Sequence, residues 1–514
     1  MDFIKSLFNS EYGKTQTANG AIAFSTTGNA NLDFFGMVDE FTEDSKVLDL
    51  FKFSLNENPE LAFQNLMFLR DVKKGKGRRK EFKLILSYLI ENNMYTDIIL
   101  SLVANSMFTD SGRADDFHCI LDYPNSEIFP RYVKILQYVI ENHLDGTLIA
   151  KWLPTKGSKT NKIRTQRANT LAKCLGMTPR EYRKFVVAKR KQLDLVETKV
   201  VNEDFASIVY STVPSKAMMR YYGIFCNKDS DNFQAYLDLL NQPKDEVVEQ
   251  TKMNMNTVSP SEVLAPVIEA ETQYWTHRSD KYNEDYIKAA WNSLPRVETE
   301  KKTLIVADVS GSMGQANAKP MKISVASAIF ASESLPGIWK DKMITFSESP
   351  MLFDFSNYES VVDKVKAIMN ADWGMSTNID LVFKLIYSQY QNADNPQAVE
   401  LDRIVIVSDM EFNECIRADK RSYEFWQDKF KSLGVKLPEI VFWNVNATTF
   451  QVKADEVATA VISGDAIGLF DLVLNGDVPS PSAFMIETLN KTVPLTKLTE
   501  LENQYNLLKI SREF

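Results

Sequence analysis

Two continuous apolar runs in the C-terminal half of this 514-residue chain most constrain its fold. Thr303 to Asp308 (TLIVAD) and Asp402 to Ser408 (DRIVIVS) lack the alternation of polar and apolar side chains that marks a half-exposed strand. Such runs are typical of strands buried on both faces, as in parallel sheets covered by helices. Parallel strands need helical crossovers, so the rest of this half should alternate between helix and strand.

The segments after Pro295 follow that alternation. Further strands are predicted at Lys342–Ser347, Pro438–Asn444 and Glu456–Ser463, the last of them before a terminal helix. Apolar residues recur at helical spacing in Pro320–Leu335, Tyr358–Asn370 and Asn378–Tyr390. We therefore predict that residues 299–514 form a doubly wound, Rossmann-like α/β domain with a parallel-rich sheet.

The N-terminal half has a different spacing of apolar residues, which predicts an α-helical domain. From about residue 30 to 240 the apolar residues recur at helical spacing, and Asn58-Pro59-Glu60 has the composition of a helix start. Short polar breaks separate these segments, so we expect a stack of antiparallel helices that resembles HEAT-type solenoids. Residues 243–298 are predicted to connect this domain, residues 1–298, to the second one.

The cysteines and the N-terminus indicate the compartment. Cys119, Cys174, Cys226 and Cys415 are scattered and form no CxxC pair, which argues against a disulfide framework and against zinc. No stretch reaches the ~18 uninterrupted apolar residues of a membrane span, and the first residues lack a long apolar segment. We expect a monomeric cytoplasmic protein without membrane contact, with association with a virus particle as an open alternative.

Small oxygen-bearing side chains gather in three loops next to the predicted strands. Asp308, Ser310 and Ser312 alternate after the first apolar run, Thr377 precedes a predicted helix, and Asp409 follows the second run. Loops at the carboxyl ends of parallel strands converge at one edge of a sheet. Oxygen ligands without nitrogen or sulfur suit a hard divalent cation, Mg²⁺ ahead of Mn²⁺ or Ca²⁺. The alternative is that the DxSxS string is merely a capped turn.

At these five positions the sequence resembles the von Willebrand factor A family. The metal-ion-dependent adhesion site of that family reads Asp-x-Ser-x-Ser, then Thr, then Asp, as do Asp308, Ser310, Ser312, Thr377 and Asp409 here. The resemblance implies that the hydroxyls bind the metal and that the aspartates bind it directly or through water. It also implies one open coordination position for an acidic side chain of a protein partner.

Positive charge is concentrated in one part of an acidic chain. The net charge is -9, yet residues 151–200 hold 14 Lys or Arg against three acids, a local balance of +11. This concentration predicts an anion-binding surface, with a solvated helix face as the alternative. Trp152 and Tyr182, the nearest aromatic residues, are more typical of a core. The candidate residues are Lys151, Lys156, Lys159, Lys162, Arg164, Arg167, Lys173 and Arg180.

A second basic segment, Lys74-Gly75-Lys76-Gly77-Arg78-Arg79, precedes a helix predicted to begin near Lys80. Free backbone amides and the positive end of the helix dipole would here join the side chains in holding a phosphate. A flexible loop whose lysines keep it soluble is the equal alternative. The candidates are Lys74, Lys76, Arg78 and Arg79, together with Arg113.

Several strings of the helical half resemble the TROVE module of the Ro ribonucleoprotein family. The closest likeness is to a poorly characterised TROVE-like family of bacteria and their viruses. The resemblance implies a ring of helical repeats closed by a von Willebrand factor A domain, with small or structured RNA on the basic residues. The strings are Phe68–Arg79, Gly112–Asp116, Lys151–Pro154, Tyr182–Glu197 and Val213–Met218.

No enzymatic motif is found, and we expect the protein not to be an enzyme. The three histidines neighbour no motif Ser, Cys or Asp, and no nucleophile elbow, P-loop or HExxH string is present. Two functions remain. The first is an RNA-binding scaffold of Ro-like type with a metal site for a partner. The second is a protein-interaction scaffold, associated with a virus particle or with an ATPase, that captures an acidic side chain through the metal without binding RNA.

Overall fold

The computed structural model describes residues 13–108, 113–157, 161–242, 252–271, 282–346, 350–371, 378–393, 399–414, 421–446 and 448–492. The chain forms two compact units. We call the first the sheet unit, which comprises Met1–Thr42, Phe53–Asn65 and Phe205–Thr488. We call the second the helical unit, which comprises Glu43–Lys52, Leu66–Asp204 and Leu489–Phe514.

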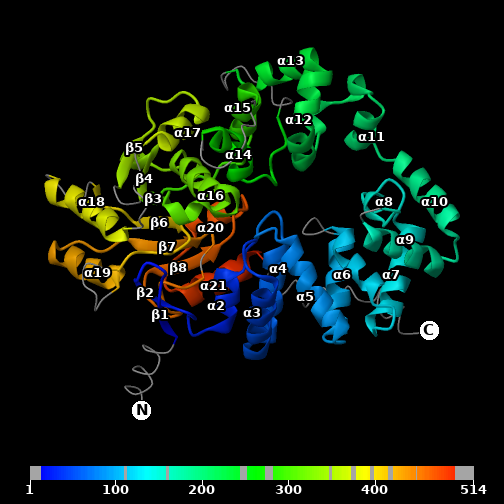
Figure 1. The fold of residues 1–514 in the computed structure, drawn as a ribbon, viewed down its shortest axis with the longest axis horizontal. Coiled ribbons are helices and arrows are strands. Elements are labelled where there is room, and N and C mark those ends of the chain that lie inside the picture. The colour runs from blue at the N-terminus through cyan, green and yellow to red at the C-terminus, as the bar shows by residue number, and fades with distance from the viewer. Residues whose placement is uncertain are drawn as a thin grey trace. The chain divides into compact units, whose positions relative to one another are not determined.

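A six-stranded sheet in the order β5-β4-β3-β6-β7-β8 is the centre of the sheet unit (Figure 1). Every neighbouring pair is parallel except β4 and β5, so the predicted parallel-rich α/β fold of the C-terminal half is confirmed. β3 and β6 are buried at every residue, as their apolar runs predicted. The edge strand β5, exposed at three of its four residues, was not predicted. The strands are β3 (Thr303–Asp308), β4 (Lys342–Phe346), β5 (Met351–Asp354), β6 (Arg403–Ser408), β7 (Glu439–Asn444) and β8 (Thr459–Ser463).

Helices cover the sheet, and α16 packs directly on β3, β4 and β6. It begins at Gln315, ahead of the predicted Pro320. The outer helix α14 packs in turn on α16 and α17 through a buried apolar face (Figure 1). The helices of this region are α14 (Pro260–Glu271), α15 (Glu284–Asn292), α16 (Gln315–Ser332), α17 (Val361–Met369), α18 (Ile379–Asn392), α19 (Ser422–Ser432), α20 (Leu469–Asn475) and α21 (Pro481–Thr492).

The division into units differs from the predicted division after residue 298. Residues 1–42 and the helices beyond residue 205 group with the sheet. Trp291 of α15 explains part of this, because its ring packs edge-on against Phe330 of α16 and its indole N–H donates to Glu333 at 3.0 Å. The additional elements are β1 (Lys14–Gln16), β2 (Ile22–Phe24), α2 (Ala30–Met37), η2 (Phe205–Ser207), η3 (Tyr210–Thr212), α12 (Ser215–Lys228) and α13 (Ser230–Leu240).

Helix α2 lies against the edge of the sheet at β8. A Cβ on Gly36 would lie 2.8 Å from Val461 Cγ1, so a side chain there would force α2 away. The amide of Asn444, at the end of β7, donates to the Gly36 carbonyl at 3.0 Å. These contacts bind α2 to the last two strands of the sheet.

The helical unit consists of short helices, as predicted for the N-terminal half, and they pack on other helices that are nearby in the chain. α6 contacts α7, α9 contacts α10, and η1 contacts α5. Phe82 and Phe117 meet edge-on in its core, with 5.8 Å between ring centroids. α3 (Asp44–Glu57) and α4 (Pro59–Arg70) belong to both units. The other helices are α5 (Arg79–Glu91), α6 (Thr96–Phe108), η1 (Ala114–Asp122), α7 (Ile128–Asn142), α8 (Ile149–Trp152), α9 (Lys162–Cys174), α10 (Pro179–Lys191) and α11 (Val196–Val201).

Within the described part of the chain, none of the helices has the length and apolarity to cross a membrane. The three cysteines that the structure describes, Cys119, Cys174 and Cys226, are free thiols. Cys415 lies outside the described residues.

A buried arginine joins β6 to the segment that follows α20. Arg403 is fully buried at the start of β6, and its guanidinium donates to Glu439 Oε2 at 2.6 Å. It also donates to the carbonyls of Val473 at 2.5 Å and Gly476 at 2.6 Å. The Gly476 carbonyl also accepts from Lys301 Nζ at 3.2 Å, so the buried Val473 carbonyl is the one that depends on Arg403 for a charged donor.

We expect Arg403→Met to lower the free energy of unfolding by about 3 kcal/mol, because it leaves buried acceptors without their donor. Glu439→Gln is the matched variant. It should cost about 1 kcal/mol, because the Glu439 side chain is one-third exposed and an amide oxygen still accepts from Arg403. Urea denaturation of both variants measures the difference, and equal losses would contradict the anchoring role of Arg403.

Candidate functional site

The two aspartates of the predicted metal site lie at one edge of the sheet. Asp308 ends β3 and Asp409 follows β6, and these strands are adjacent and parallel. Asp308 is fully buried and Asp409 is 3% exposed. The backbone N–H of Ser310 donates to Asp308 Oδ1 at 2.9 Å, and the Ser408 hydroxyl donates to Asp308 Oδ2 at 2.5 Å. The structure therefore brings two predicted loops together.

The serine hydroxyls complete this cluster of oxygens. Ser310 Oγ and Ser312 Oγ lie 3.2 Å apart, and the Ser312 side chain is also hydrogen-bonded to Asp409. Thr377, the fifth predicted ligand, lies outside the described residues. No group of three or more His, Cys, Asp or Glu side chains placed to hold a metal occurs in the described part of the chain. A metal here would thus depend on two carboxylates and on hydroxyls.

The two carboxylates are in an electrostatically unfavourable position. Burial, and next the charge of Asp409, raise the pKa of Asp308 to about 7, and burial also raises the pKa of Asp409. Neither forms an ion pair with any Lys, Arg or His that the structure describes. Two buried acids without a cationic partner, surrounded by hydroxyls, fit a hard divalent cation.

A hairpin from the N-terminus contacts the loop after Asp409. Glu411 accepts from the backbone N–H of Ala18 at 2.6 Å, and the Thr17 hydroxyl donates to the Phe412 carbonyl at 2.6 Å. The charge of Glu411 also acts to raise the pKa of Asp409. The sequence contained no sign of this contact, because the hairpin and the loop lie almost 400 residues apart.

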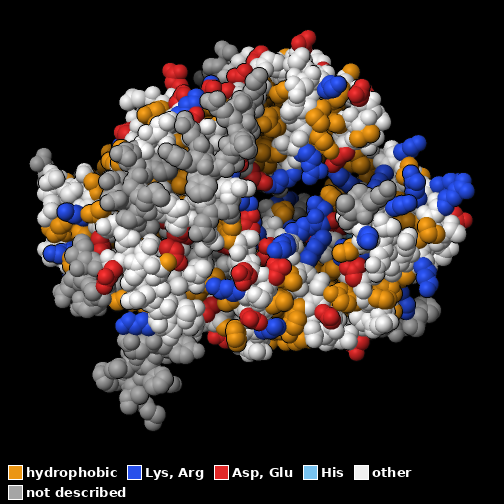
Figure 2. Space-filling view, in the orientation of Figure 1, with side chains coloured by type: hydrophobic (Ala, Val, Ile, Leu, Met, Phe, Trp, Pro, Cys, Tyr) orange, Lys and Arg blue, Asp and Glu red, His pale blue; other side chains and the backbone are white. Residues whose placement is uncertain are grey.

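Helices α9 and α10 carry most of the predicted basic residues of the 151–200 region. Figure 2 shows Lys and Arg side chains gathered over these helices, at the right of the view. α10 begins with a capping box between Thr178 and Glu181 and with Pro179 at its first position. We call the exposed cations that pair with no described residue the basic surface: Lys156, Lys162, Arg164, Lys173, Arg180, Arg183, Lys184 and Lys191. Sequence reasoning did not single out the last three.

Other predicted candidates are engaged inside the helical unit. Lys151 pairs with Glu197 at 2.7 Å, and Arg167 grips both oxygens of Asp122 at 2.9 and 3.0 Å. Arg79 and Arg113 pair with Asp115. Lys159 lies outside the described residues. The ion pairs of Lys151 and Arg167 join separate helices, so these two residues are less suited to a passing anion than the basic surface.

Four backbone amides of the KGKGRR segment, those of Lys74, Lys76, Gly77 and Arg78, are already hydrogen-bonded. The N–H groups of Lys73 and Lys74 donate to the side chain of Asp71 at 2.8 and 3.1 Å. Those of Lys76 and Arg78 donate to carbonyls at the end of α4, at 3.0 and 2.7 Å. Lys76 is 3% exposed. The amides of these four residues are therefore not free for a phosphate, because they close the turn at the end of α4. Phosphate binding by the side chains of this segment stays a prediction.

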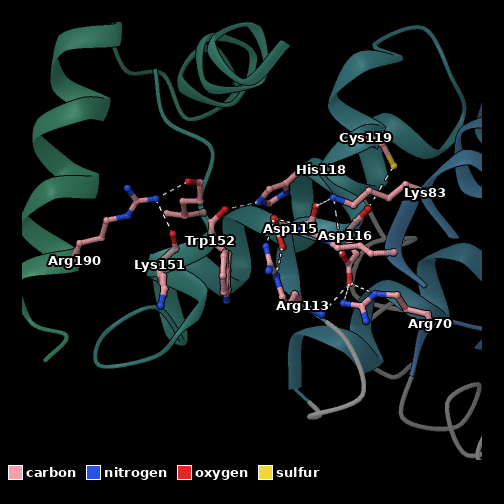
Figure 3. A network of polar contacts seen from close by, with 12 residues as sticks. Arg70, Lys83, Arg113, Asp115, Asp116, His118, Cys119, Lys151, Trp152 and Arg190 are labelled. Carbon is pink, nitrogen blue, oxygen red and sulfur yellow. Dashed lines mark hydrogen bonds and ion pairs between the residues drawn. The ribbon is translucent and has the colours of Figure 1, made fainter. Parts of the chain in front are cut away.

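His118 links η1 to the end of α8 (Figure 3). Its Nδ1 lies 2.8 Å from the Tyr132 hydroxyl and its Nε2 lies 3.1 Å from the Trp152 carbonyl oxygen. The Arg113 guanidinium stacks 3.5 Å above the ring of Trp152, which is half-buried. Tyr182 is buried and donates to the Pro154 carbonyl at 2.8 Å. Both aromatic residues thus contribute to packing between helices.

Comparison with known proteins gives families without an assigned activity. Residues 302–503 match a family described as Domain of unknown function (DUF7788), and residues 17–108 and 144–302 match Domain of unknown function (DUF2828). The Uncharacterized protein L728 of Acanthamoeba polyphaga mimivirus is 26% identical over 522 residues, which cover 93% of this chain and 87% of the viral protein.

Two solved structures are weakly similar. The Ro (RSR) protein of Deinococcus radiodurans matches with a TM-score of 0.38 and 13% identity over 87% of this chain and 99% of that chain. Proximal thread matrix protein 1 from the mussel byssus matches with a TM-score of 0.25 and 13% identity over 35% of this chain and 47% of its own. These scores are too low to carry an argument about fold or function.

We predict that the helical unit loses stability in mild acid because of His118. Burial lowers the pKa of this histidine from 6.5 to about 4, so the unfolded chain takes up a proton before the folded chain does. Stability is complete above pH 6.5 and falls as the pH drops toward 4, by about 1.4 kcal/mol per pH unit.

His118→Gln keeps a hydrogen-bonding side chain but removes this titration. Between pH 6.5 and pH 5, the wild type should lose about 2 kcal/mol more than the variant. Urea denaturation at a series of pH values measures this difference. Parallel pH profiles for the two proteins would refute the assignment to His118.

Proposed function

We propose that the chain binds RNA through the basic surface of the helical unit. The observation that carries the proposal is the charge of α9 and α10, which together hold ten Lys and Arg side chains and one acid, Glu181. Because nucleic-acid affinity comes mainly from neutralised phosphates, such a surface favours RNA even though the whole chain is acidic. Glu181 accepts from Thr178 in the cap of α10, and its single negative charge offsets only one of these ten positive charges.

Polar side chains between the cations support this proposal. Asn161, Gln166 and Asn169 are exposed on α9 or at its start, and each can donate a hydrogen bond to a phosphate or a ribose. We also propose that the paired helices of this unit are HEAT-like repeats of the Ro type. Phosphate contacts from such a rigid surface read the shape of an RNA rather than its sequence.

For the sheet unit, we propose a Mg²⁺ site built from Asp308, Ser310, Ser312 and Asp409, with Thr377 as a further ligand. Its support is the pair of buried carboxylates without a described cationic partner. The metal would present an open position to an acidic side chain of a protein partner. Mn²⁺ and Ca²⁺ suit the same oxygen ligands. A protein scaffold that uses this metal contact without RNA is the second candidate function, and the same observation favours it.

We expect the combined variant Lys162→Glu, Arg164→Glu, Arg180→Glu and Lys184→Glu to lose RNA binding. With four phosphate contacts removed, any residual binding should show a slope of log K against log salt smaller by about 3. Fluorescence anisotropy with a short single-stranded RNA and with an RNA hairpin, each over a series of salt concentrations, measures both effects.

The matched control carries the same charge change on the sheet unit, at the exposed residues Lys340, Lys384, Lys429 and Lys436. This control should bind RNA like the wild type. If both quadruple variants lose affinity equally, net charge is responsible and the basic surface is not the site. If the wild type binds neither RNA, the protein scaffold is the better proposal.

For the metal site, Mg²⁺ should raise the unfolding temperature of the wild type. At a Mg²⁺ concentration of about a hundred times Kd, the free energy of unfolding should rise by about 2.7 kcal/mol. Asp409→Asn should be at least as stable as the wild type in EDTA, because it removes the repulsion between the two acids, and should gain nothing from Mg²⁺. Asp477→Asn, at an exposed position, is the control and should respond like the wild type. An equal response of all three proteins would exclude this site.

A further inference from the structure

Cations outnumber carboxylates in a partly buried cluster of the helical unit, drawn in Figure 3. The cluster lies where the end of α4, the first turns of α5 and the start of η1 meet. Its carboxylates come from η1 and its cations come from all three elements. We call it the arginine cluster: Arg70, Arg79, Lys83 and Arg113, with Asp115 and Asp116.

The Asp116 carboxylate accepts hydrogen bonds from three of its neighbours. Arg70 Nε donates to its Oδ2 at 2.6 Å, and Arg79 Nε donates to its Oδ1 at 2.6 Å. The backbone N–H of Arg113 adds a third hydrogen bond at 3.0 Å. The Asp116 side chain is 1% exposed and that of Arg70 is 6% exposed. This carboxylate therefore has no capacity left for another cation.

The Asp115 carboxylate is likewise bound by two arginine side chains. Arg113 grips both of its oxygens at 2.9 Å, and Arg79 Nη2 contacts one of them. Burial acts to raise the pKa of Asp115, but the hydrogen bond from Arg113 and the charges of Arg79 and Arg113 outweigh it and lower the pKa to about 2. Asp115 is thus ionised at any ordinary pH, and its charge is shared between two arginines.

Two donors of the cluster remain poorly satisfied. Arg70 Nη1 is buried and hydrogen-bonds to no described residue. Among the described residues, Lys83 Nζ donates only to the Asp115 carbonyl, at 3.1 Å, and it lies 3.9 Å from Asp116 Oδ1. Burial, and next the charge of Arg79, lower the pKa of Lys83. Both observations indicate an excess of positive charge where solvent screens it poorly.

We propose that the arginine cluster is a binding site for one phosphate group. Four cations against two carboxylates leave two positive charges, and a phosphate monoester carries about -1.5 to -2 at pH 7. A carboxylate ligand would neutralise at most half of this excess. Arginine forks also match the oxygens of phosphate better than those of a monovalent halide.

Helix α5 supports the same ligand. Arg79 is its first residue, and its N-cap, Arg78, supplies no side-chain cap, so the positive end of the helix dipole adds to the field of the cluster. Side chains of Arg79, Lys83 and Arg113 are between one-quarter and about one-third exposed, which leaves a face open to a ligand. The proposal does not depend on RNA binding by the basic surface, since the two sets share no residue.

The phosphate can be free or can be the terminal phosphate of a nucleic acid. Isothermal titration with inorganic phosphate against the full chain tests the shared chemistry without RNA. An RNA with a 5′-phosphate and the same RNA with a 5′-hydroxyl separate the two sources. Tighter binding of the phosphorylated RNA assigns the site to a terminal phosphate, and equal binding of the two RNAs assigns it to free phosphate.

Lys83→Gln is the variant to measure, because removing this crowded cation relieves repulsion and should leave the fold intact. We expect it to weaken inorganic phosphate binding at least about tenfold, as loss of a charged hydrogen bond does. Lys189→Gln is the matched control: Lys189 belongs to the same unit, forms a single ion pair with Asp145, and has a side chain as exposed as that of Lys83. This control should bind phosphate like the wild type.

Arg113→Gln provides a second variant with the same expected loss. The quadruple variant of the basic surface should retain phosphate binding, so failure of the RNA proposal and failure of this one are distinguishable. Absence of phosphate binding to the wild type overturns the proposal. Equal weakening in Lys83→Gln and Lys189→Gln overturns it as well.

Discussion

The parallel pairing of β3 with β6 is the interaction on which the sheet unit depends. It aligns two fully buried strands residue by residue, Ile305 opposite Val405, and so brings the acids that follow them to the same edge. Asp308 and Asp409 become near neighbours in a place that water does not screen, which raises the pKa of both. The cost of that arrangement is the strongest physical reason for a cation there. The rest of the unit, from α16 over the sheet to α2 against β8, keeps this edge in place.

In the helical unit, the distribution of ion pairs decides the role of each basic residue. Arg167 and Lys151 each pair with an acid on another helix, and Lys189 pairs with Asp145 in the turn between α7 and α8. Arg190 also joins α10 to α8, because it donates to the carbonyls of Ala150, Lys151 and Leu153. The cations left over lie exposed on α9 and α10, or are crowded in the arginine cluster. The same residue types therefore serve packing, an exposed surface and a partly buried cluster.

Much of the fold followed from local patterns. The apolar runs identified β3 and β6, and helical spacing identified most of the helices, because burial on both faces and on one face leave different periodicities. The edge strand β5 was not predicted from the sequence, since Met351–Asp354 is short and mostly exposed. The candidate ligands of the proposed metal could be predicted as a set only because the strand ends converge in any parallel sheet. Asp308 and Asp409 lie at the edge where that rule placed them.

The sequence by itself determined the helical pattern of the N-terminal half and the alternation of strands and helices in the C-terminal half. It also determined the oxygen-bearing loops and the concentration of positive charge at residues 151–200. Only the tertiary structure decided which charged side chains are engaged in ion pairs and which remain exposed. Asp115 and Asp116 lie far along the chain from Arg70 and Arg79, and the amides of the KGKGRR segment turned inward to cap α4. The hairpin that holds Glu411 comes from the other end of the chain. Local spacing records the face of a helix or strand, whereas ion pairing is set by distances between segments that no local pattern encodes.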